Sequence, residues 1–232
     1  MPVSEALLKT FDLLKPLDKA LLDQLSNECS LKSFNRRQIV LESNKPSEYV
    51  FLLFEGRLQG VDFTIDGREV GLYFVEPGDF FGELNLFDNR IQNEHVVALT
   101  SSKVLTIPKN LFSPMMMSSE KFMEAVFQRM ANRIRTLNEQ RNLLSITNIP
   151  QRVSSLIWSM LPTDEKNADS PNLNNPPTHQ EIAMMLNLSR ETVTRVFKLL
   201  QEKGLTKKEG STRLIVINKT TLKRIIDGED EF

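Results

Sequence analysis

Cysteine, histidine and long apolar runs are scarce or missing in this 232-residue sequence. The single cysteine, Cys29, cannot form an internal disulfide, and it excludes an iron–sulfur cluster built from several cysteines of the chain. With only two histidines, the sequence offers no spaced His/Cys cluster for a metal, and it has no Ser/His/Asp set or Walker loop. We therefore expect no catalytic residues, no metal site and no enzymatic activity.

The sequence also lacks the features of membrane and secreted proteins. It has no run of 18 apolar residues, and its first residues form neither a basic nor an apolar leader segment. Its hydrophobic fraction of 40% and charged fraction of 25% are typical of soluble globular proteins. We expect a soluble protein without a membrane partner, and the cytosol is the default compartment for a chain with one cysteine.

Charge is distributed unevenly, although the formal net charge is only −1. Residues 178–226 carry ten lysines and arginines and four glutamates, a net charge of +6, whereas the last six residues carry −4. A basic segment joined to a mildly acidic remainder is typical of a protein in which only one domain meets phosphate. The distribution favours a nucleic-acid-binding module near the C-terminus.

Short strand-like runs follow a helical segment in the first half of the chain. Residues 4–27 repeat leucines at spacings of three and four, which predicts short amphipathic helices. From residue 31 the period changes, and Asp66-Gly67 between two alternating runs predicts a β-hairpin. The runs are residues 39–41, 50–54, 58–63, 70–75, 80–81, 95–100 and 104–107. Short strands at this spacing predict a small barrel or jelly roll.

A long helix is predicted over residues 122–149, where apolar residues alternate spacings of four and three. The seam consists of Met123, Phe127, Met130, Ile134, Leu137, Arg141 and Leu144. Polar flanks that include Arg129 and Arg133 make this seam narrow, which favours a two-stranded coiled coil between two copies of the chain. The alternative is a core helix lying on the sheet, and Arg141 is an irregularity that the coiled coil does not explain.

Two short helices joined by a tight turn are predicted in residues 178–204. Thr178 with Glu181 three residues later is a capping box, and Asn187 tolerates the left-handed backbone of a tight turn. Ser189 is expected to cap a second helix over residues 190–203, which Gly204 closes. Two helices with this connection form the helix-turn-helix of DNA-binding proteins.

The outer face of the second helix carries side chains suited to reading bases. Arg190 and Arg195 can each pair with guanine O6 and N7 in the major groove, and Glu191 can accept from cytosine N4. An acidic side chain on this face favours base readout over simple neutralisation of phosphate. The alternative is a solvated helix face with an ion pair between Glu191 and Arg195.

The segments on either side of these helices favour the DNA-binding interpretation. Residues 205–217 predict a β-hairpin with basic residues near its tip, placed to meet backbone phosphate. A final helix is predicted from about residue 219. Residues 162–177 are rich in proline, asparagine and aspartate, and they predict a loop.

These motifs resemble the CRP/FNR superfamily of bacterial transcription regulators over nearly the whole chain. Residues 81–87 (FGELNLF) resemble the family's phosphate-binding cassette, and residues 178–183 (THQEIA) and 188–195 (LSRETVTR) resemble its DNA-binding signature. The resemblance implies an α+β fold in three parts. These are a cyclic-nucleotide-binding-type β-roll sensor domain (1–121), a dimerisation helix (122–149) and a winged helix-turn-helix DNA-binding domain (150–232).

The resemblance implies specific roles for residues of the DNA-binding part. Arg190, Glu191 and Arg195 are implied to contact the bases of a GTGA-type half-site, which a homodimer would read twice in a palindrome. Phosphate contacts are expected from Thr178, His179, Gln180, Ser189, Thr192 and Lys198. Related proteins carry arginine where His179 stands, so this contact is expected to be weaker or pH-dependent. Residues 161–177 lie where relatives touch RNA polymerase, which is a further expected partner.

The resemblance also places a candidate ligand pocket in the first domain. Its residues are Gly82, Glu83, Leu84, Arg90, Asn93, Glu94, Leu137 and Asn138. In cyclic-AMP-binding members an Arg-Ser pair holds the phosphate where Asn93 and Glu94 stand, and a Thr-Ser pair meets adenine where Leu137 and Asn138 stand. A carboxylate facing a phosphodiester would repel it, so we expect no cyclic-AMP control of that kind unless Arg90 compensates.

The sequence therefore does not determine the identity of the effector. Gly82 and Glu83 are interpreted as turn architecture, with Glu83 capping backbone amides. A cyclic nucleotide, cyclic di-GMP, another small molecule or no cofactor at all are the alternatives, as is a sensor whose main output is a protein contact. By resemblance to a gas-sensing member of the family that uses Pro, Cys and His ligands, a haem or gas sensor would use Pro2, Cys29 and His95, but a lone histidine on a strand is more often structural.

Overall fold

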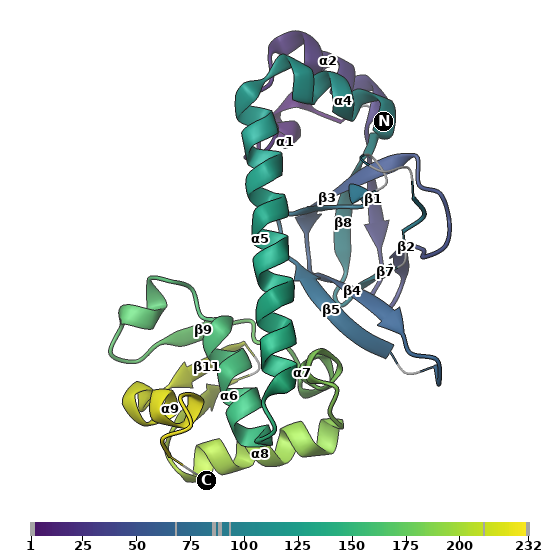
Figure 1. The fold of residues 1–232 in the computed structure, drawn as a ribbon. Helices are drawn as coiled ribbons and strands as arrows, with labels where there is room; N and C mark the ends of the chain where they lie inside the picture. The colour runs from purple at the N-terminus through teal and green to yellow at the C-terminus, as the bar shows by residue number, and fades with distance from the viewer. Residues whose placement is uncertain are drawn as a thin grey trace. The chain divides into compact units, whose positions relative to one another are not determined.

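The computed structural model describes residues 3–67, 69–84, 87, 90–92, 94–210 and 212–230. It divides the chain into two compact units, Met1–Thr136 and Leu137–Phe232 (Figure 1). The first unit holds two antiparallel sheets with their helices, and the second holds helices and a small three-stranded sheet. Within the described ranges, no helix combines the length and apolarity that crossing a membrane requires.

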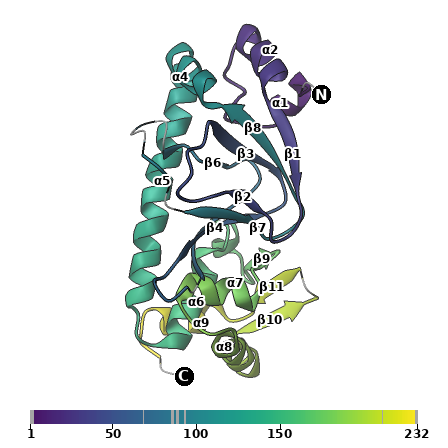
Figure 2. The same ribbon diagram turned by 90° about the vertical axis from the view of Figure 1, so that its right-hand side faces the viewer.

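Two four-stranded antiparallel sheets form the β-roll of the first unit (Figure 2). One sheet has the order β1-β8-β3-β6, with β1 (Ser30–Phe34), β8 (Ser102–Pro108), β3 (Tyr49–Glu55) and β6 (Phe80–Phe81). The other has the order β2-β7-β4-β5, with β2 (Ile39–Leu41), β7 (His95–Ala98), β4 (Leu58–Phe63) and β5 (Glu69–Val75). The predicted strands are confirmed. The sequence runs did not include β1, because this mostly exposed strand carries little apolar periodicity.

Two glycines fix turns of the β-roll. Gly67 has a φ of +77° in the predicted hairpin between β4 and β5, and its amide donates to the Thr64 carbonyl at 2.8 Å. Gly82, directly after β6, has a φ of +79°, and a Cβ there would lie 2.9 Å from the ring of Phe51. Only glycine therefore lets the chain turn here while it stays against Phe51.

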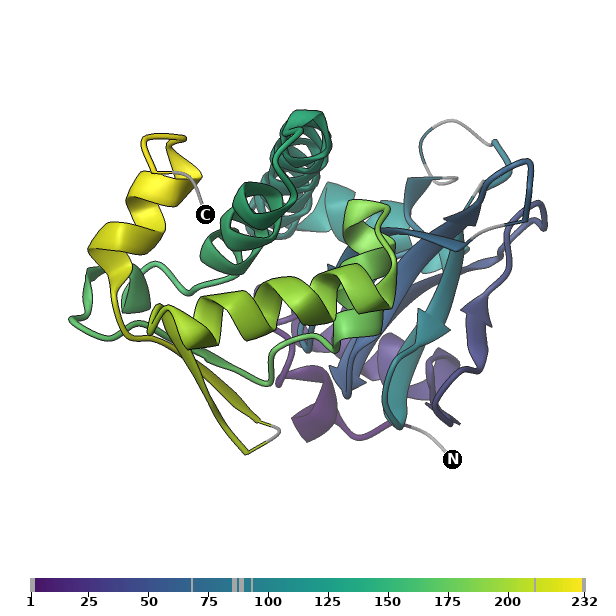
Figure 3. The ribbon, with the colours of Figure 1, turned by 90° about the horizontal axis from the view of Figure 1, so that it is seen from below.

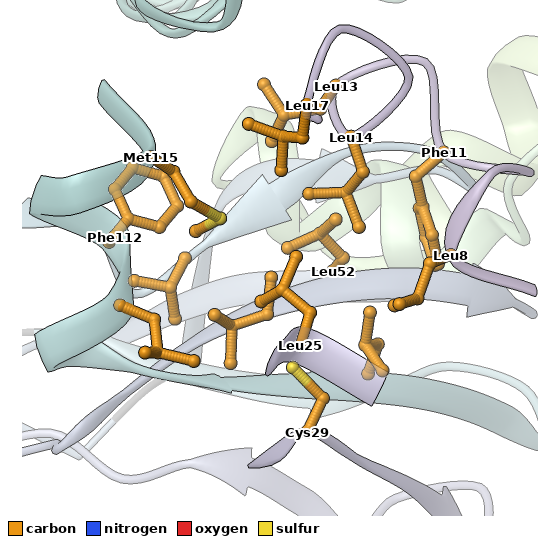
Figure 4. Close-up of a cluster of buried hydrophobic side chains, with 14 of the residues drawn as sticks. Leu8, Phe11, Leu13, Leu14, Leu17, Leu25, Cys29, Leu52, Phe112 and Met115 are labelled. Atoms are coloured by element: carbon orange, nitrogen blue, oxygen red, sulfur yellow. The ribbon is translucent and has the colours of Figure 1, made fainter. Parts of the chain in front are cut away.

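Leucine and phenylalanine side chains fill the core between the β-roll and its helices (Figure 4). The helices are α1 (Glu5–Leu8), α2 (Lys19–Glu28) and α4 (Lys109–Ser118). Leu25 of α2, Leu52 of β3 and Phe112 of α4 are almost completely buried, and each such side chain stabilises the fold by roughly 1.5–3 kcal/mol. Cys29 lies in the same cluster, and burial raises the pKa of its thiol to about 12.

One stripe of the long helix α5 (Glu120–Ser145) belongs to this core. Phe122 and Val126 are fully buried in it, and Met130 packs against it although the sequence assigned that residue to a seam between copies. The core-helix alternative therefore describes the N-terminal part of α5. The sequence pattern missed this stripe because the apolar seam is the stronger of two interleaved periodicities.

A second stripe of α5 is apolar and exposed. Phe127 and Ile134 are 56% and 59% exposed in the single chain, and Leu137 and Leu144 are exposed as well. These four residues are members of the predicted seam. An exposed apolar stripe at heptad spacing marks a surface that another helix can cover.

The second unit is a winged helix-turn-helix. Its helices are α6 (Ile149–Ser159), α7 (His179–Leu186), α8 (Arg190–Glu202) and α9 (Lys219–Ile226), with a 3₁₀ turn, η1 (Glu165–Asn167). Its sheet has the order β10-β11-β9, with β10 (Thr206–Glu209), β11 (Arg213–Val216) and β9 (Asn172–Asn174). The two predicted helices, the hairpin and the final helix are all confirmed.

The prediction of a loop over residues 162–177 is wrong for residues 172–174, which form strand β9. Leu173 of β9 pairs with Leu214 of β11, and both side chains are buried. The Glu165 carboxylate accepts from the backbone amide of Asn172 at 3.0 Å and from its side-chain amide at 2.7 Å. A three-residue strand rich in asparagine has no periodicity of its own, because its partner lies about forty residues away.

Candidate nucleic-acid interface and sensor pocket

Local hydrogen bonds fix the first helix of the helix-turn-helix and the turn that follows it. The Glu181 carboxylate accepts from the Thr178 amide at 2.9 Å, and the Thr178 hydroxyl accepts from the Glu181 amide at 3.3 Å. This confirms the capping box. Asn187 ends α7 in the left-handed conformation, with φ of 52° and ψ of 49°. The turn therefore has the geometry that the sequence predicted.

The recognition helix α8 begins at a capped N-terminus and presents a polar outer face. The Ser189 hydroxyl accepts from the Thr192 amide at 3.1 Å, while Val193, Val196, Phe197 and Leu200 form the buried face. Figure 3 shows α7, α8 and the β10–β11 hairpin, and α8 contacts both α7 and β10. Its direction is thus set by packing on one side and by the cap at its start.

The three predicted base-reading side chains are all exposed on this face. Arg195 donates to the Thr192 hydroxyl at 3.4 Å, and the described residues include no ion pair between Arg195 and Glu191. The solvated ion pair considered from the sequence is therefore not formed. Hydrogen bonds to its own backbone amide and to Ser189 lower the pKa of Glu191, which keeps that carboxylate charged. Arg190 and Arg195 remain available to acceptors from outside the chain.

His179 lies beside the recognition helix and packs on it. Its ring stacks on Phe197 with centroids 4.5 Å apart, and its Nδ1 lies 2.9 Å from the Thr194 hydroxyl. The Thr194 hydroxyl donates to the Arg190 carbonyl at 2.9 Å, so Nδ1 is the donor in its contact with Thr194. Burial lowers the pKa of His179, and the nearby charges of Lys208 and Arg190 lower it further. The neutral ring thus keeps its proton on Nδ1 and none on Nε2.

The remaining predicted phosphate contacts surround this helix pair. Gln180 and Ser189 are exposed near the starts of α7 and α8, and Thr192 is half-buried. Lys198 is exposed and lies 3.6 Å from Glu202. Lys207 and Lys208 of β10 are exposed and add positive charge on the hairpin. The structure therefore brings the predicted base and phosphate contacts into one compact unit.

In the first unit, Arg133 of α5 lies between two carboxylates of the β-roll. Its Nη1 donates to Glu83 Oε1 at 2.8 Å, and its Nη2 donates to Glu94 Oε1 at 2.6 Å. The Glu83 side chain is 1% exposed, and the side chains of Arg133 and Glu94 are each 12% exposed. The guanidinium carbon lies 4.1 Å from the ring centroid of Tyr73. One guanidinium therefore contacts two carboxylates and an aromatic face.

Two further donors complete this cluster around Glu94. The Tyr73 hydroxyl donates to Glu94 Oε1, and Gln92 Nε2 donates to the same oxygen at 2.8 Å. Burial and the Glu94 charge raise the pKa of Tyr73 well above its usual value, so its hydroxyl keeps the proton it donates. Burial opposes the charge of Arg133, but Tyr73, Glu83 and Glu94 outweigh it and raise its pKa. Burial also raises the pKa of Glu83, an effect that Arg133 opposes.

Among the predicted pocket residues, the structure brings Glu83 and Glu94 together. The Glu83 carboxylate binds Arg133, because α5 presents a cation to it, and a hydrogen bond from its own backbone amide also opposes the rise in its pKa that burial causes, as the sequence interpretation of an amide cap implies. Leu84 and Arg90 are exposed, and Asn93 lies outside the described residues. Leu137 and Asn138 are exposed on α5, beyond the boundary of the first unit.

The residues considered for haem lie in separate surroundings. The Nε2 atom of His95 lies 2.7 Å from the Ser43 hydroxyl, and its ring meets Phe63 edge-on. Cys29 is buried in the leucine-rich core, and Pro2 lies outside the described residues. Within the part of the chain that is described, no group of three or more His, Cys, Asp or Glu side chains is placed to hold a metal.

Sequence reasoning missed Arg133, Tyr73 and Gln92 as members of the pocket. Arg133 was placed on the polar flank of the long helix, as was Arg129, which pairs with Asp79 at 2.9 Å. Phe122, Val126, Arg129 and Arg133 repeat at spacings of four, three and four. This second stripe was the available signal, and it places both arginines on the buried side of α5.

Comparisons with known proteins agree with both units. Residues 31–119 match the cyclic nucleotide-binding domain, and residues 151–225 match the Crp-like helix-turn-helix domain. The cAMP-activated global transcriptional regulator Vfr of Pseudomonas aeruginosa is 25% identical over 198 residues, covering 84% of this chain and 92% of that protein.

Solved structures show the same fold. FixK2 from Bradyrhizobium japonicum has a TM-score of 0.72 at 20% identity, covering 85% of this chain and 96% of that one. The c-di-GMP responsive global regulator CLP of Xanthomonas campestris has a TM-score of 0.67 at 18% identity, covering 87% of this chain and all of that one.

A β-roll of the cyclic-nucleotide-binding type followed by a long helix and a winged helix-turn-helix defines a DNA-binding transcription regulator with a sensor domain. The chain belongs to the CRP/FNR family of transcription regulators.

Proposed function

We propose that this regulator binds as a homodimer to a GTGA-type palindrome. The observation that carries the proposal is the outer face of α8, where Arg190, Glu191 and Arg195 are exposed on a helix held by a cap and a packed turn. Guanidinium and carboxylate groups on this face match guanine acceptors and the cytosine donor. The basic residues of the hairpin support contact with the adjoining phosphates.

The exposed stripe of α5 supports the homodimer. Phe127, Ile134, Leu137 and Leu144 lie at heptad spacing and are exposed in the single chain. A second copy of the same helix would cover them in a two-fold arrangement, which matches the symmetry of a palindrome. RNA polymerase is the further partner proposed for residues 161–177, where β9 and the 3₁₀ turn order part of the segment.

The sensor domain supports control by an effector other than cyclic AMP. Its cyclic-AMP-binding relatives use a pocket whose residues are substituted here. Glu94 stands at the position where those relatives carry the serine of the Arg-Ser pair, and its carboxylate is already held by Arg133, Tyr73 and Gln92. A carboxylate at this place opposes a phosphodiester. A cyclic dinucleotide such as cyclic di-GMP, or another small molecule bound elsewhere on the sensor, is the alternative class of effector.

Selection of bound duplexes from a random-sequence library tests the proposed readout. The expected result is two GTGA-type half-sites in inverted orientation, with centres about one helical turn apart, because a two-fold dimer presents two equivalent recognition helices. Recovery of a single unrepeated half-site would contradict binding as a homodimer. Recovery of no sequence preference would contradict base readout by α8.

The affinity for this palindrome is expected to rise as the pH falls from about 8 to about 5.5. Neutral His179 offers an unprotonated Nε2 to a phosphate, and its pKa in the free protein is lowered. A nearby phosphate would raise the pKa of His179 in the DNA complex. Binding would then take up a proton, so the affinity increases as the pH falls below the pKa of His179 in the complex. A difference of one pKa unit corresponds to about a tenfold gain.

Fluorescence anisotropy at constant ionic strength measures this dependence. His179→Arg is expected to bind with little pH dependence, and His179→Ala to lose the gain at low pH. Equal pH profiles for the original protein and His179→Ala would show that His179 does not meet phosphate.

A further inference from the structure

The polar cluster inside the β-roll suggests which chemistry the candidate ligand pocket accepts. We propose that this pocket is a guanidinium site rather than an anion site, and that Arg133 of the same chain is its occupant. Among the described residues, Glu83, Glu94 and Tyr73 contact the guanidinium. The inference concerns the sensor domain alone and does not depend on how α8 reads DNA.

The geometry of the cluster fits a planar, forked cation. The two terminal nitrogens of Arg133 reach different carboxylates, Glu83 at 2.8 Å and Glu94 at 2.6 Å, while the central carbon lies 4.1 Å from the centroid of the Tyr73 ring. Guanidinium presents donors in a rigid fork and also stacks on aromatic faces. An ammonium group is a compact point charge and cannot make all three contacts in this way.

The charges of the cluster disfavour an anion. Two carboxylates surround one guanidinium, so a phosphate that approached would face net negative charge in a site with little water. Glu83 Oε2 is buried and has no hydrogen-bond partner among the residues that the structure describes, so the site offers a further acceptor. Tyr73 and Gln92 use their donors on Glu94. The cluster therefore favours the binding of hydrogen-bond donors and cations over the binding of anions.

The occupant reaches the site from α5, because Arg133 belongs to that helix and both carboxylates belong to the β-roll segment. A tethered group has a high effective concentration compared with a free ligand. The helix is thus held against the β-roll without a diffusible effector. Arg133 is a positioning residue in this arrangement, and the carboxylates of Glu83 and Glu94 are its receptors.

Replacing Arg133 with alanine and supplying the missing group in solution tests the proposal. The midpoint of thermal unfolding of R133A is expected to fall by about 5 °C or more, because the buried Glu83 carboxylate loses its cationic partner and Glu94 loses one of its three donors. Millimolar ethylguanidine is expected to recover most of this loss. Ethylammonium and sodium chloride at the same ionic strength are expected to recover much less, and R133K is expected to remain destabilised.

Arg135→Ala is the matched control, because Arg135 is exposed on the same helix and donates only to Asn132 at 2.9 Å among the hydrogen bonds of the described residues. Its midpoint of thermal unfolding is expected to equal that of the original protein and to stay unchanged when ethylguanidine is added. A folded R133A whose midpoint ethylguanidine does not raise would overturn the proposal.

If R133A does not fold, calorimetric titration of the unaltered protein with cyclic AMP tests whether Arg133 fills the pocket. An absence of binding heat supports a pocket filled by Arg133, and tight binding overturns it. Neither measurement involves DNA, so failure here is distinct from failure of the proposed palindrome reading.

Discussion

Replacing Arg190 with alanine is expected to weaken binding to the GTGA-type palindrome by about 1–3 kcal/mol per half-site and to relax the preference at one guanine. This corresponds to roughly 5- to 150-fold for each half-site. The side chain is exposed at the first turn of α8, and its removal leaves the buried face of the helix unchanged. The loss should therefore appear in DNA recognition and leave folding stability almost unaltered.

The informative quantity is the ratio of affinities for the palindrome and for a random duplex. R190A is expected to reduce this ratio, whereas Lys208→Ala is expected to weaken both affinities together and to lower the salt dependence by about one ion. Lys208 serves as the control because it is an exposed cation on the hairpin. An R190A variant with the original ratio would remove Arg190 from base readout.

Replacing Ile134 with glutamate is expected to convert the protein to monomers and to lower its affinity for the palindrome by about 100-fold or more. Ile134 is 59% exposed in the single chain, and in a parallel two-helix seam it faces its own copy. Two glutamates would then lie opposite each other in a desolvated contact. The monomer keeps one recognition helix and loses the gain that comes from binding two half-sites at once.

Sedimentation measures the oligomeric state, and anisotropy with full and half palindromes measures the binding. The control is Met117→Glu, because Met117 is an apolar residue of α4 that is exposed but lies outside the α5 stripe. I134E is expected to bind an isolated half-site as the original protein does. A dimeric I134E with unchanged affinity for the full palindrome would place the homodimer contact elsewhere.

The features that the sequence predicted well depend on contacts between near neighbours in the chain. The Thr178–Glu181 capping box, the left-handed Asn187 and the Ser189 cap all arise within three residues, so the motif alone determines the geometry. The Asp66-Gly67 hairpin is similar, because turn chemistry sets its register. The exposed base-reading face of α8 follows from the same local periodicity.

The features that the sequence did not predict depend on partners far along the chain. Strand β9 exists because β11 lies beside it, and nothing in residues 172–174 indicates this. The Arg133 cluster joins residues that are 39 and 50 positions apart. A polar flank and a buried ion pair look alike in sequence, since both are charged residues at helical spacing. Only the fold distinguishes them.

The burial of Cys29 has a practical consequence for measuring how such a regulator moves. The only thiol of the chain is packed among leucines, and its pKa is raised to about 12, so it holds its proton and resists labelling reagents. A cysteine introduced at an exposed site such as Gln201 on α8 would then be the single reactive position. Spin labels attached there would report the distance between the two recognition helices of a dimer directly, in the free protein and on DNA, with no background from the native thiol.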